Sequence, residues 1–248
     1  MPASPVDDEE PRTDARSITD RVADQLRERI KYGRLAPGQR LIEADLIEQL
    51  HVSRSTIRAA FGQLATEGIV TLERNRGARV RLLDVEEIRQ LYELRATLEG
   101  RAAGLTAERI DIDGCRTAMR ELSRQNDEFA DGSIFADYWS FNEGLHRVVL
   151  QYSGNEMLRR MAEQTRTLTY HHHLQAAAQG DPRRLVSIGH ACVQHDAILG
   201  AILVGDATRA EQGMREHILD NGRGIVAFME AEGAALSLGR VSSFGSGR

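Results

Sequence analysis

An asparagine and a histidine stand four residues apart in the segment NEGLHRVVLQYSGN, residues 142–155. This spacing places the side chains of Asn142 and His146 on one face of a helix, about one turn apart. An amide oxygen and an imidazole nitrogen so placed can bind the same metal ion. The pair also fits the interior of a packed helix, where each polar group would need its own hydrogen-bond partner.

Two later histidines bear on the choice between these interpretations. His195 shares its helical face with Ile198 and Leu199. His217 shares a face with Met214 and with small glycine residues. Both are therefore expected to point into an apolar interior. Three separately buried imidazoles would each need a partner, so the pattern favours a common metal site over three unrelated core residues. Its mixed ligands suit zinc, nickel, iron, copper or manganese.

Arg95 is a candidate for binding an anionic ligand, because a guanidinium group can hold a carboxylate through two parallel hydrogen bonds. It shares a helical face with Tyr92. An internal salt bridge of Arg95 with Glu93 or Glu99 explains the same residue equally well.

The run YHHHL, residues 170–174, also contains possible ligands. Consecutive residues of a helix point about 100° apart, so the three histidines cannot share one face. At most one side chain of the run, that of His171 or Tyr170, is expected to face a pocket.

Helices must carry these candidates. From Val85 onward, apolar residues recur at helical spacing in about six segments separated by Gly, Asp, Pro or Asn. The pattern predicts an all-α antiparallel bundle over residues 88–232, preceded by a linker at 83–87. The Gly- and Ser-rich end, 233–248, is expected to be a flexible tail.

The preceding part of the chain has a different pattern. Residues 17–82 predict a winged helix-turn-helix, with three helices followed by a two-stranded wing. The helices are expected in SITDRVADQLRERIKYG, EADLIEQLHV and SRSTIRAAFGQLATEG, and the wing in IVTLERNRGARVRLL. Residues 1–16 are acidic and proline-rich and are expected to be disordered. The fold class predicted for the whole chain is mainly α.

The charges follow this division. Residues 17–81 contain 12 Lys or Arg and 8 Asp or Glu side chains and carry +4, whereas residues 82–248 contain 18 and 24 and carry −6. A basic first module indicates a polyanionic partner. Two cysteines without a CxxC pair fit a reducing compartment. No apolar run is long enough for a membrane span or signal peptide, so the sequence predicts a cytoplasmic protein that does not bind membranes.

The third predicted helix is suited to the major groove of DNA. Its first turn and a half carry Ser53, Arg54, Ser55 and Arg58, while apolar residues fill the opposite face. An ordinary solvated face is the competing interpretation for any one arginine. It explains less well the whole set together with the arginines around Gly77 in the wing.

The stretch LAPGQRLIEADLIEQLHVSRSTIRAAFGQLATEGIVTLERNRGARV resembles the winged helix of the GntR family of bacterial transcription regulators. The family pattern contains PG-x-x-L, V-S-R-x-x-[IV]-R-x-A-[LF], L-x-x-[DE]-G-[LI]-[VI] and R-G-x-x-V. A residue that differs is His51, where many members have glycine. The resemblance implies that DNA is contacted by Ser53, Arg54, Ser55, Arg58, Arg76 and Gly77.

The segments LYELRATLEGRAA, NEGLHRVVLQYSGN and HDAILGAILVGDATRAEQGMREHI are similar to the FCD-type ligand domain of the FadR subgroup. Many members hold a divalent metal ion through Asp or Asn, a histidine one turn later, and two further histidines. The corresponding positions are Asn142, His146, His195 and His217. Zinc is the first choice of metal, with nickel, iron or manganese as alternatives. An Asn in place of Asp removes one negative charge and is expected to weaken binding of hard ions.

Together these features predict a homodimeric regulator, more specifically a repressor, and not an enzyme. It would bind a pseudo-palindromic double-stranded operator and respond to a small carboxylate held near the metal by Arg95, Tyr92 and His171. One alternative is a metal-dependent enzyme acting on a small carboxylate, although HExxH, a nucleophile elbow and a phosphate-binding glycine loop are all missing from the sequence. The other is an architectural DNA-binding dimer without an effector.

Overall fold

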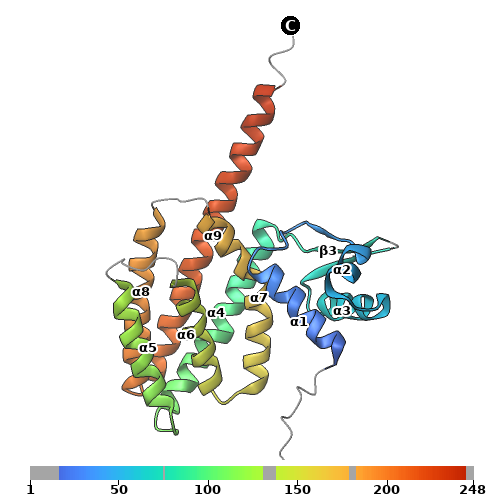
Figure 1. Ribbon diagram of the computed structural model, residues 1–248. Helices are drawn as coiled ribbons and strands as arrows, with labels where there is room; N and C mark the ends of the chain where they lie inside the picture. Colours follow the sequence, from blue (N-terminus) through green and yellow to red (C-terminus); the bar gives the residue numbers. More distant parts are fainter. Residues whose placement is uncertain (1–16, 75, 131–137, 179–182, 244–248) are drawn as a thin grey trace, which may run out of the picture. The chain divides into compact units, whose positions relative to one another are not determined.

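The computed structural model describes residues 17–243 except 75, 131–137 and 179–182 (Figure 1). The side chains of residues 130, 170–187 and 232–243 also lie outside the description. The chain divides into two compact units, the first up to Arg81 and the second from Leu82 onward, with the short segment Lys31–Arg34 grouped with the second. Within the described residues both units are mainly helical, as the sequence predicts.

The first unit has the predicted helix-turn-helix and wing. Its apolar core includes Leu26, Ile57, Phe61 and Leu64, each at most 1% exposed, which come from the first and third helices. The elements are α1 (Ile18–Lys31), β1 (Arg40–Leu41), α2 (Glu43–Leu50), α3 (Arg54–Thr66), β2 (Val70–Glu73) and β3 (Gly77–Val80).

The wing contains a third strand that the sequence did not predict. The sheet order is β1-β3-β2, with both pairs antiparallel. Arg40 lies opposite Arg79 and Leu41 opposite Ala78. A two-residue strand is too short to show the alternation of polar and apolar residues by which strands are recognised.

Gly77 is required by the packing of this sheet. Its φ angle is +89°, and a Cβ atom at this position would lie 2.3 Å from the carbonyl oxygen of Leu41. No larger residue fits unless the backbone moves. The glycine that the sequence suggested for close approach to DNA therefore has a structural role in the wing.

The turn between α2 and α3 is built from two specialised residues. His51 ends α2 in the left-handed conformation, with φ 51° and ψ 44°. Ser53 begins α3 as its N-cap, and its hydroxyl oxygen accepts a hydrogen bond from the amide of Thr56 at 3.1 Å. These two residues set the direction of α3 relative to α2.

The second unit is a helical bundle, as predicted. In the part of it that the structure describes, the helices are α4 (Val85–Glu108), α5 (Cys115–Ala130), α6 (Tyr138–Tyr152), α7 (Glu156–Ala178), α8 (Arg183–Leu203) and α9 (Ala207–Ser243). Its helix α4 contacts α6, α7, α8 and α9 (Figure 1). Tyr92 packs on α9 at Gly222, where a Cβ atom would lie 2.6 Å from the ring.

The ends of two helices differ from the prediction. Helix α4 begins at Val85, within the stretch expected to be a linker, because Asp84 and Glu87 form a capping box. Helix α9 continues to Ser243, where a flexible tail from residue 233 was expected. The alanine and leucine residues of this stretch favour a helix despite its glycines.

The described helices include none that is long and apolar enough to cross a membrane.

Candidate metal centre and nucleic-acid interface

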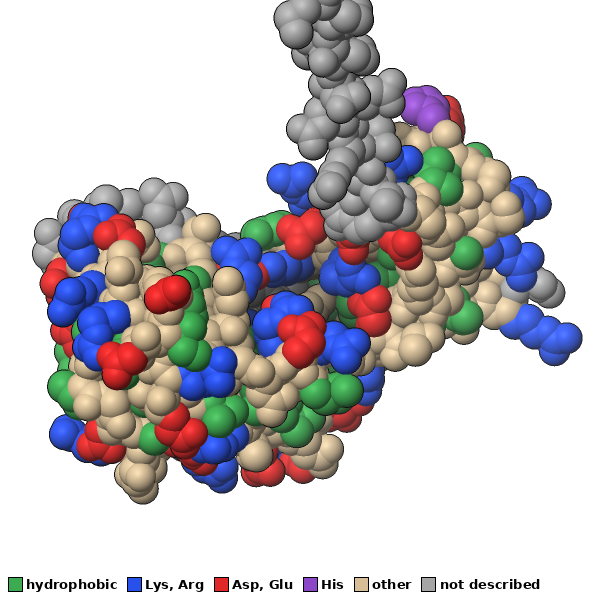
Figure 2. Space-filling view, turned by 90° about the horizontal axis from the view of Figure 1, so that it is seen from below, with side chains coloured by type: hydrophobic (Ala, Val, Ile, Leu, Met, Phe, Trp, Pro, Cys, Tyr) green, Lys and Arg blue, Asp and Glu red, His purple; other side chains and the backbone are tan. Residues whose placement is uncertain are grey.

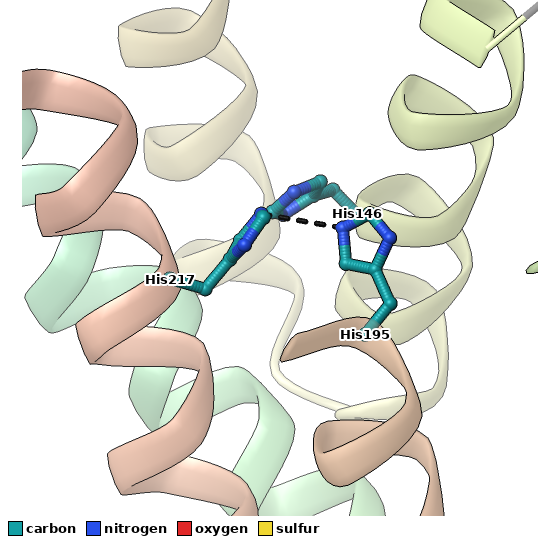
Figure 3. A group of neighbouring side chains, drawn as sticks. All are labelled: His146, His195 and His217. Atoms are coloured by element: carbon teal, nitrogen blue, oxygen red, sulfur yellow. Dashed lines mark hydrogen bonds between the residues drawn. The ribbon is translucent and has the colours of Figure 1, made fainter. Parts of the chain in front are cut away.

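Three imidazole rings converge in the interior of the helical unit. They belong to His146 on α6, His195 on α8 and His217 on α9, and they point toward one another (Figure 3). One ring nitrogen from each lies within 4.8 Å of the other two. The Nε2 atoms of His195 and His217 are only 3.3 Å apart. The sequence pattern that predicted inward-facing histidines is matched by this arrangement.

The distance between the ring nitrogens fits two ligands of one ion. Nitrogens about 2.1 Å from a metal lie about 3.0 Å apart at an octahedral angle and about 3.4 Å apart at a tetrahedral angle. The observed 3.3 Å between His195 and His217 falls within this range.

Burial keeps the three histidines neutral. Their exposed fractions are 2% for His146 and 0% for His195 and His217. Desolvation lowers the pKa of His146 to about 4, even though the nearby Glu99 carboxylate acts in the opposite direction. Burial, together with the neighbouring His146, lowers the pKa of His195 to about 3, and the pKa of His217 also falls well below its usual range. Near pH 7 the imidazoles thus offer lone pairs, as metal ligands must.

Asn142 lies one turn before His146 on α6. Its Oδ1 atom is buried and has no hydrogen-bond partner among the described residues. A buried amide oxygen without a partner costs free energy, because it has lost its contacts with water. A cation within reach of this oxygen would supply the missing interaction.

The carboxylate of Glu99 contacts the histidine centre, which consists of His146, His195 and His217. Glu99 is 1% exposed, and its oxygens accept hydrogen bonds from Arg95 Nε and Arg166 Nη1, both at 2.9 Å. The same carboxylate lies 2.7 Å from His146 Nδ1, although the ring N–H is not aligned for a regular hydrogen bond. Burial alone would raise the pKa of Glu99, but the two guanidinium groups hold it well below its usual range.

The predicted effector residues fall in different surroundings. Arg95 is 7% exposed, forms the internal salt bridge with Glu99 and donates to Thr169 Oγ1 at 3.1 Å. Its guanidinium carbon lies 5.0 Å from the ring centre of the buried Tyr92. The backbone of His171 belongs to α7, but its side chain lies outside the described residues.

The predicted DNA-binding residues of α3 lie on the surface of the first unit. The side chains of Arg54 and Arg58 are 71% and 72% exposed, and each lies 3.8 Å from the carboxylate of Glu43. Ser53 and Ser55 are also exposed, and their hydroxyl groups are 2.7 Å apart. Basic side chains project from this unit at the right of Figure 2.

Helix α3, which the sequence predicts to enter the major groove, and the wing enclose a hollow. Arg54, Arg58, Arg76 and Gly77 all line it. It also contains residues that sequence reasoning missed, namely Arg40, Glu43 and Glu73. Arg40 comes from the unpredicted strand β1, so nothing in the local sequence indicated its position.

The surface of the helical unit carries both acidic and basic side chains (Figure 2). Figure 2 shows its acidic and basic side chains interspersed rather than segregated.

Inside the helical unit, Asn126 and Gln194 contact the histidine centre, and Arg166 contacts Glu99. No local sequence pattern indicated these three residues, because their contacts join separate helices.

A winged helix with exposed arginines on α3, joined to a helical unit with a buried polar centre, is the architecture of a two-domain DNA-binding regulator. Residues 18–80 match the model of the bacterial regulatory proteins, gntR family, and residues 90–220 match the FCD domain. The chain therefore belongs to the GntR family, in its FCD-containing branch.

Individual relatives agree with this assignment. The "Nta operon transcriptional regulator" of Aminobacter aminovorans is 37% identical over 123 residues, which cover 49% of this chain and 57% of that protein. The "Probable D-xylose utilization operon transcriptional repressor" of Paenarthrobacter nicotinovorans is 27% identical over 209 residues, or 82% and 86% of the two chains. Both are described as regulators of transcription, which places this chain among regulators rather than enzymes.

The fold is shared with a solved structure, that of McbR/YncC from E. coli. The TM-score is 0.72 at 19% sequence identity, and the match covers 88% of this chain and 99% of the other. At this identity the likeness concerns the fold alone.

Proposed function

We propose that this protein is a homodimeric transcriptional repressor whose affinity for its operator is controlled by a small carboxylate bound near a divalent metal ion. The observation that carries the proposal is the buried histidine centre in a chain that also has a winged helix. Two copies related by a two-fold axis would bind the two halves of a pseudo-palindromic site.

The metal ligands proposed are Asn142, His146, His195 and His217. Three converging neutral imidazoles and a buried oxygen without a partner support this set. Zinc is the first choice because it favours nitrogen ligands, and nickel, iron and manganese are the alternatives. A bound ion would act as a Lewis acid toward an effector oxygen.

The proposed effector is an organic acid. Arg95 and Arg166 share the single carboxylate of Glu99, so this cluster has one excess positive charge beside the histidines. A divalent ion would add two more, which favours an anionic ligand. Tyr92, Arg95 and His171 are the residues proposed to contact it.

The proposed DNA contacts are Ser53, Arg54, Ser55, Arg58, Arg76 and Gly77. The first test compares binding to DNA from the protein's own promoter region and to random DNA, at two salt concentrations. We expect a preference for the promoter DNA and affinity that falls steeply with salt. Equal affinity for both DNAs would contradict the proposal.

A matched pair of variants locates this interface. Arg58→Ala should weaken promoter binding about 5- to 100-fold, as expected for loss of a base or phosphate contact. Arg209→Ala removes an arginine of similar exposure, 78%, from α9 and should leave affinity unchanged.

The control by metal and effector is tested on the purified full chain. Metal analysis should find about one ion per chain, and a panel of organic acids should raise the melting temperature when that ion is present. The same acids should change the affinity for promoter DNA. If neither metal nor acid changes the affinity for promoter DNA, the protein is an architectural DNA-binding dimer.

Light scattering on the purified full chain measures directly whether it is a dimer.

The variant Asn142→Asp tests the fourth ligand. A carboxylate supplies a charged oxygen where Asn142 supplies a neutral one, so the variant should bind zinc more tightly than the wild type. Chelator competition measures the affinity. Equal or weaker binding would contradict direct coordination by Asn142.

A further inference from the structure

Two amide side chains, the buried Asn126 and the half-buried Gln194, contact His195 and His217 of the histidine centre. Asn126 on α5 is 0% exposed, and its Nδ2 atom donates to the carbonyl oxygen of Cys192 at 2.9 Å and to Asp196 Oδ1 at 3.2 Å. A carbonyl and an ionised carboxylate can only accept hydrogen bonds, so the NH2 group of Asn126 must face them. The opposite end, Oδ1, then faces His195 Nδ1 at 3.2 Å.

This orientation determines where His195 carries its proton. The amide oxygen of Asn126 is an acceptor, so Nδ1 of the ring must be the donor. A neutral imidazole has one N–H only, which leaves a lone pair on Nε2. That atom is the one that points to the centre, 3.3 Å from His217.

Gln194 makes the equivalent arrangement for the other ring. Its Nε2 atom donates to Asp220 Oδ2 at 2.6 Å, so its Oε1 atom faces His217 Nδ1 at 2.9 Å. The proton of His217 is therefore also on Nδ1. With this tautomer, His217 Nε2 accepts a hydrogen bond from the side-chain Nδ2 of Asn221 at 3.1 Å.

We infer that Asn126 and Gln194 are positioning residues for the metal centre. Each holds one histidine in the tautomer with the proton on Nδ1, and both Nε2 lone pairs then face the same point. With no proton between them, the two Nε2 atoms 3.3 Å apart cannot hydrogen-bond to each other, and a cation bound by both lone pairs would stabilise their close approach. The inference deepens the proposed metal site and names the ligand atoms of two of its residues.

The tautomers are measured on the metal-free, full-length protein. Two-bond proton–nitrogen NMR correlations of the histidine rings distinguish a proton on Nδ1 from one on Nε2. We expect His195 and His217 to carry it on Nδ1. In Gln194→Met, which removes the acceptor at similar volume, His217 should populate the other tautomer while His195 stays unchanged. A proton on Nε2 of either ring in the wild type would overturn the inference.

Zinc affinity gives a second measurement, by competition with a chelator. Gln194→Met should weaken binding about 10- to 100-fold, the usual effect of losing such a partner. The double variant Gln194→Glu with Asp220→Asn exchanges carboxylate and amide, restores an acceptor for His217, and should recover the lost affinity. The control Gln212→Met makes the same replacement at an exposed position of α9 and should bind zinc like the wild type.

These results separate the inference from the proposed function. Unchanged zinc affinity in a folded Gln194→Met variant overturns the positioning role even though the metal site stands. A wild-type protein that binds no zinc contradicts the proposed metal, whereas the tautomers in the metal-free protein still decide whether Asn126 and Gln194 orient the rings.

Discussion

At the scale of single residues, Glu99 is a carboxylate in the protein interior whose charge must be neutralised by its neighbours. It is a buried carboxylate that joins three helices, through Arg95 on α4, His146 on α6 and Arg166 on α7. The charge is tolerated because two guanidinium groups neutralise it. Removing it would leave the buried Arg95 and the half-buried Arg166 without their anion.

We expect Glu99→Gln to lower the free energy of unfolding by about 3–5 kcal/mol, the usual cost of breaking a buried ion pair from one side. Urea denaturation of the full chain measures the change. Glu121→Gln, which removes a carboxylate from an exposed pair with Arg124, should leave stability unchanged. A loss at Glu99 no larger than at Glu121 would refute this account.

The sequence predicted part of this site and not the rest. The inward direction of His195 and His217 follows from apolar neighbours on the same helical face, which is local information. A salt bridge between Arg95 and Glu99 was one of the alternatives, because four residues separate them. Arg166, Asn126 and Gln194 could not be predicted, since their contacts depend on how separate helices pack.

At the scale of elements, local sequence rules predict where most helices begin and end. They fail where an element forms only because it pairs with another one. The N-caps Ser53 and Asp84 begin their helices as such residues usually do. Strand β1 exists only because β3 pairs with it, so its two residues carry no signal of their own. Gly77 was predicted for DNA contact, yet the carbonyl of Leu41 already requires a glycine there.

The turn before α3 gives a prediction about stability. His51 adopts a left-handed conformation, which costs a residue with a Cβ atom about 1 kcal/mol relative to glycine. We therefore expect His51→Gly to raise the unfolding free energy of the winged-helix unit by about 1 kcal/mol, measured by thermal or urea denaturation. The reciprocal control is Gly68→Ala, at φ +76°, which should lower it. Destabilisation by His51→Gly would show that the side chain has a contact that outweighs the backbone cost.

At the scale of the whole molecule, charge and burial divide between the two units. The basic groups of the first unit line a hollow between α3 and the wing, whereas the helical unit keeps its three interacting histidines away from water. Buried neutral histidines make the stability of the metal-free protein depend on pH. Their folded-state pKa values lie below the ordinary value near 6.5, so the unfolded chain takes up protons first as the pH falls.

The unfolding free energy of the metal-free protein should therefore decrease from pH 6.5 down to about pH 4. Each histidine contributes at most about 1.4 kcal/mol per pH unit, and this slope is reached only below pH 6.5, where the unfolded histidine becomes fully protonated. The three together therefore lose about 3 kcal/mol between pH 6.5 and 5.5. Urea denaturation at a series of pH values measures the slope. A slope of less than one proton would contradict the neutral burial of the three rings.

The salt bridge between Arg95 and Glu99 would also limit how the proposed organic acid is selected. Arg95 already donates to Glu99 through Nε, so a carboxylate that used this same nitrogen would exchange with Glu99 rather than simply add to the guanidinium. Replacing one carboxylate by another at the same guanidinium changes the free energy little. Discrimination among acids would then depend on the remainder of each molecule. The affinity for an acid would depend on the free energy needed to displace Glu99 from Arg95.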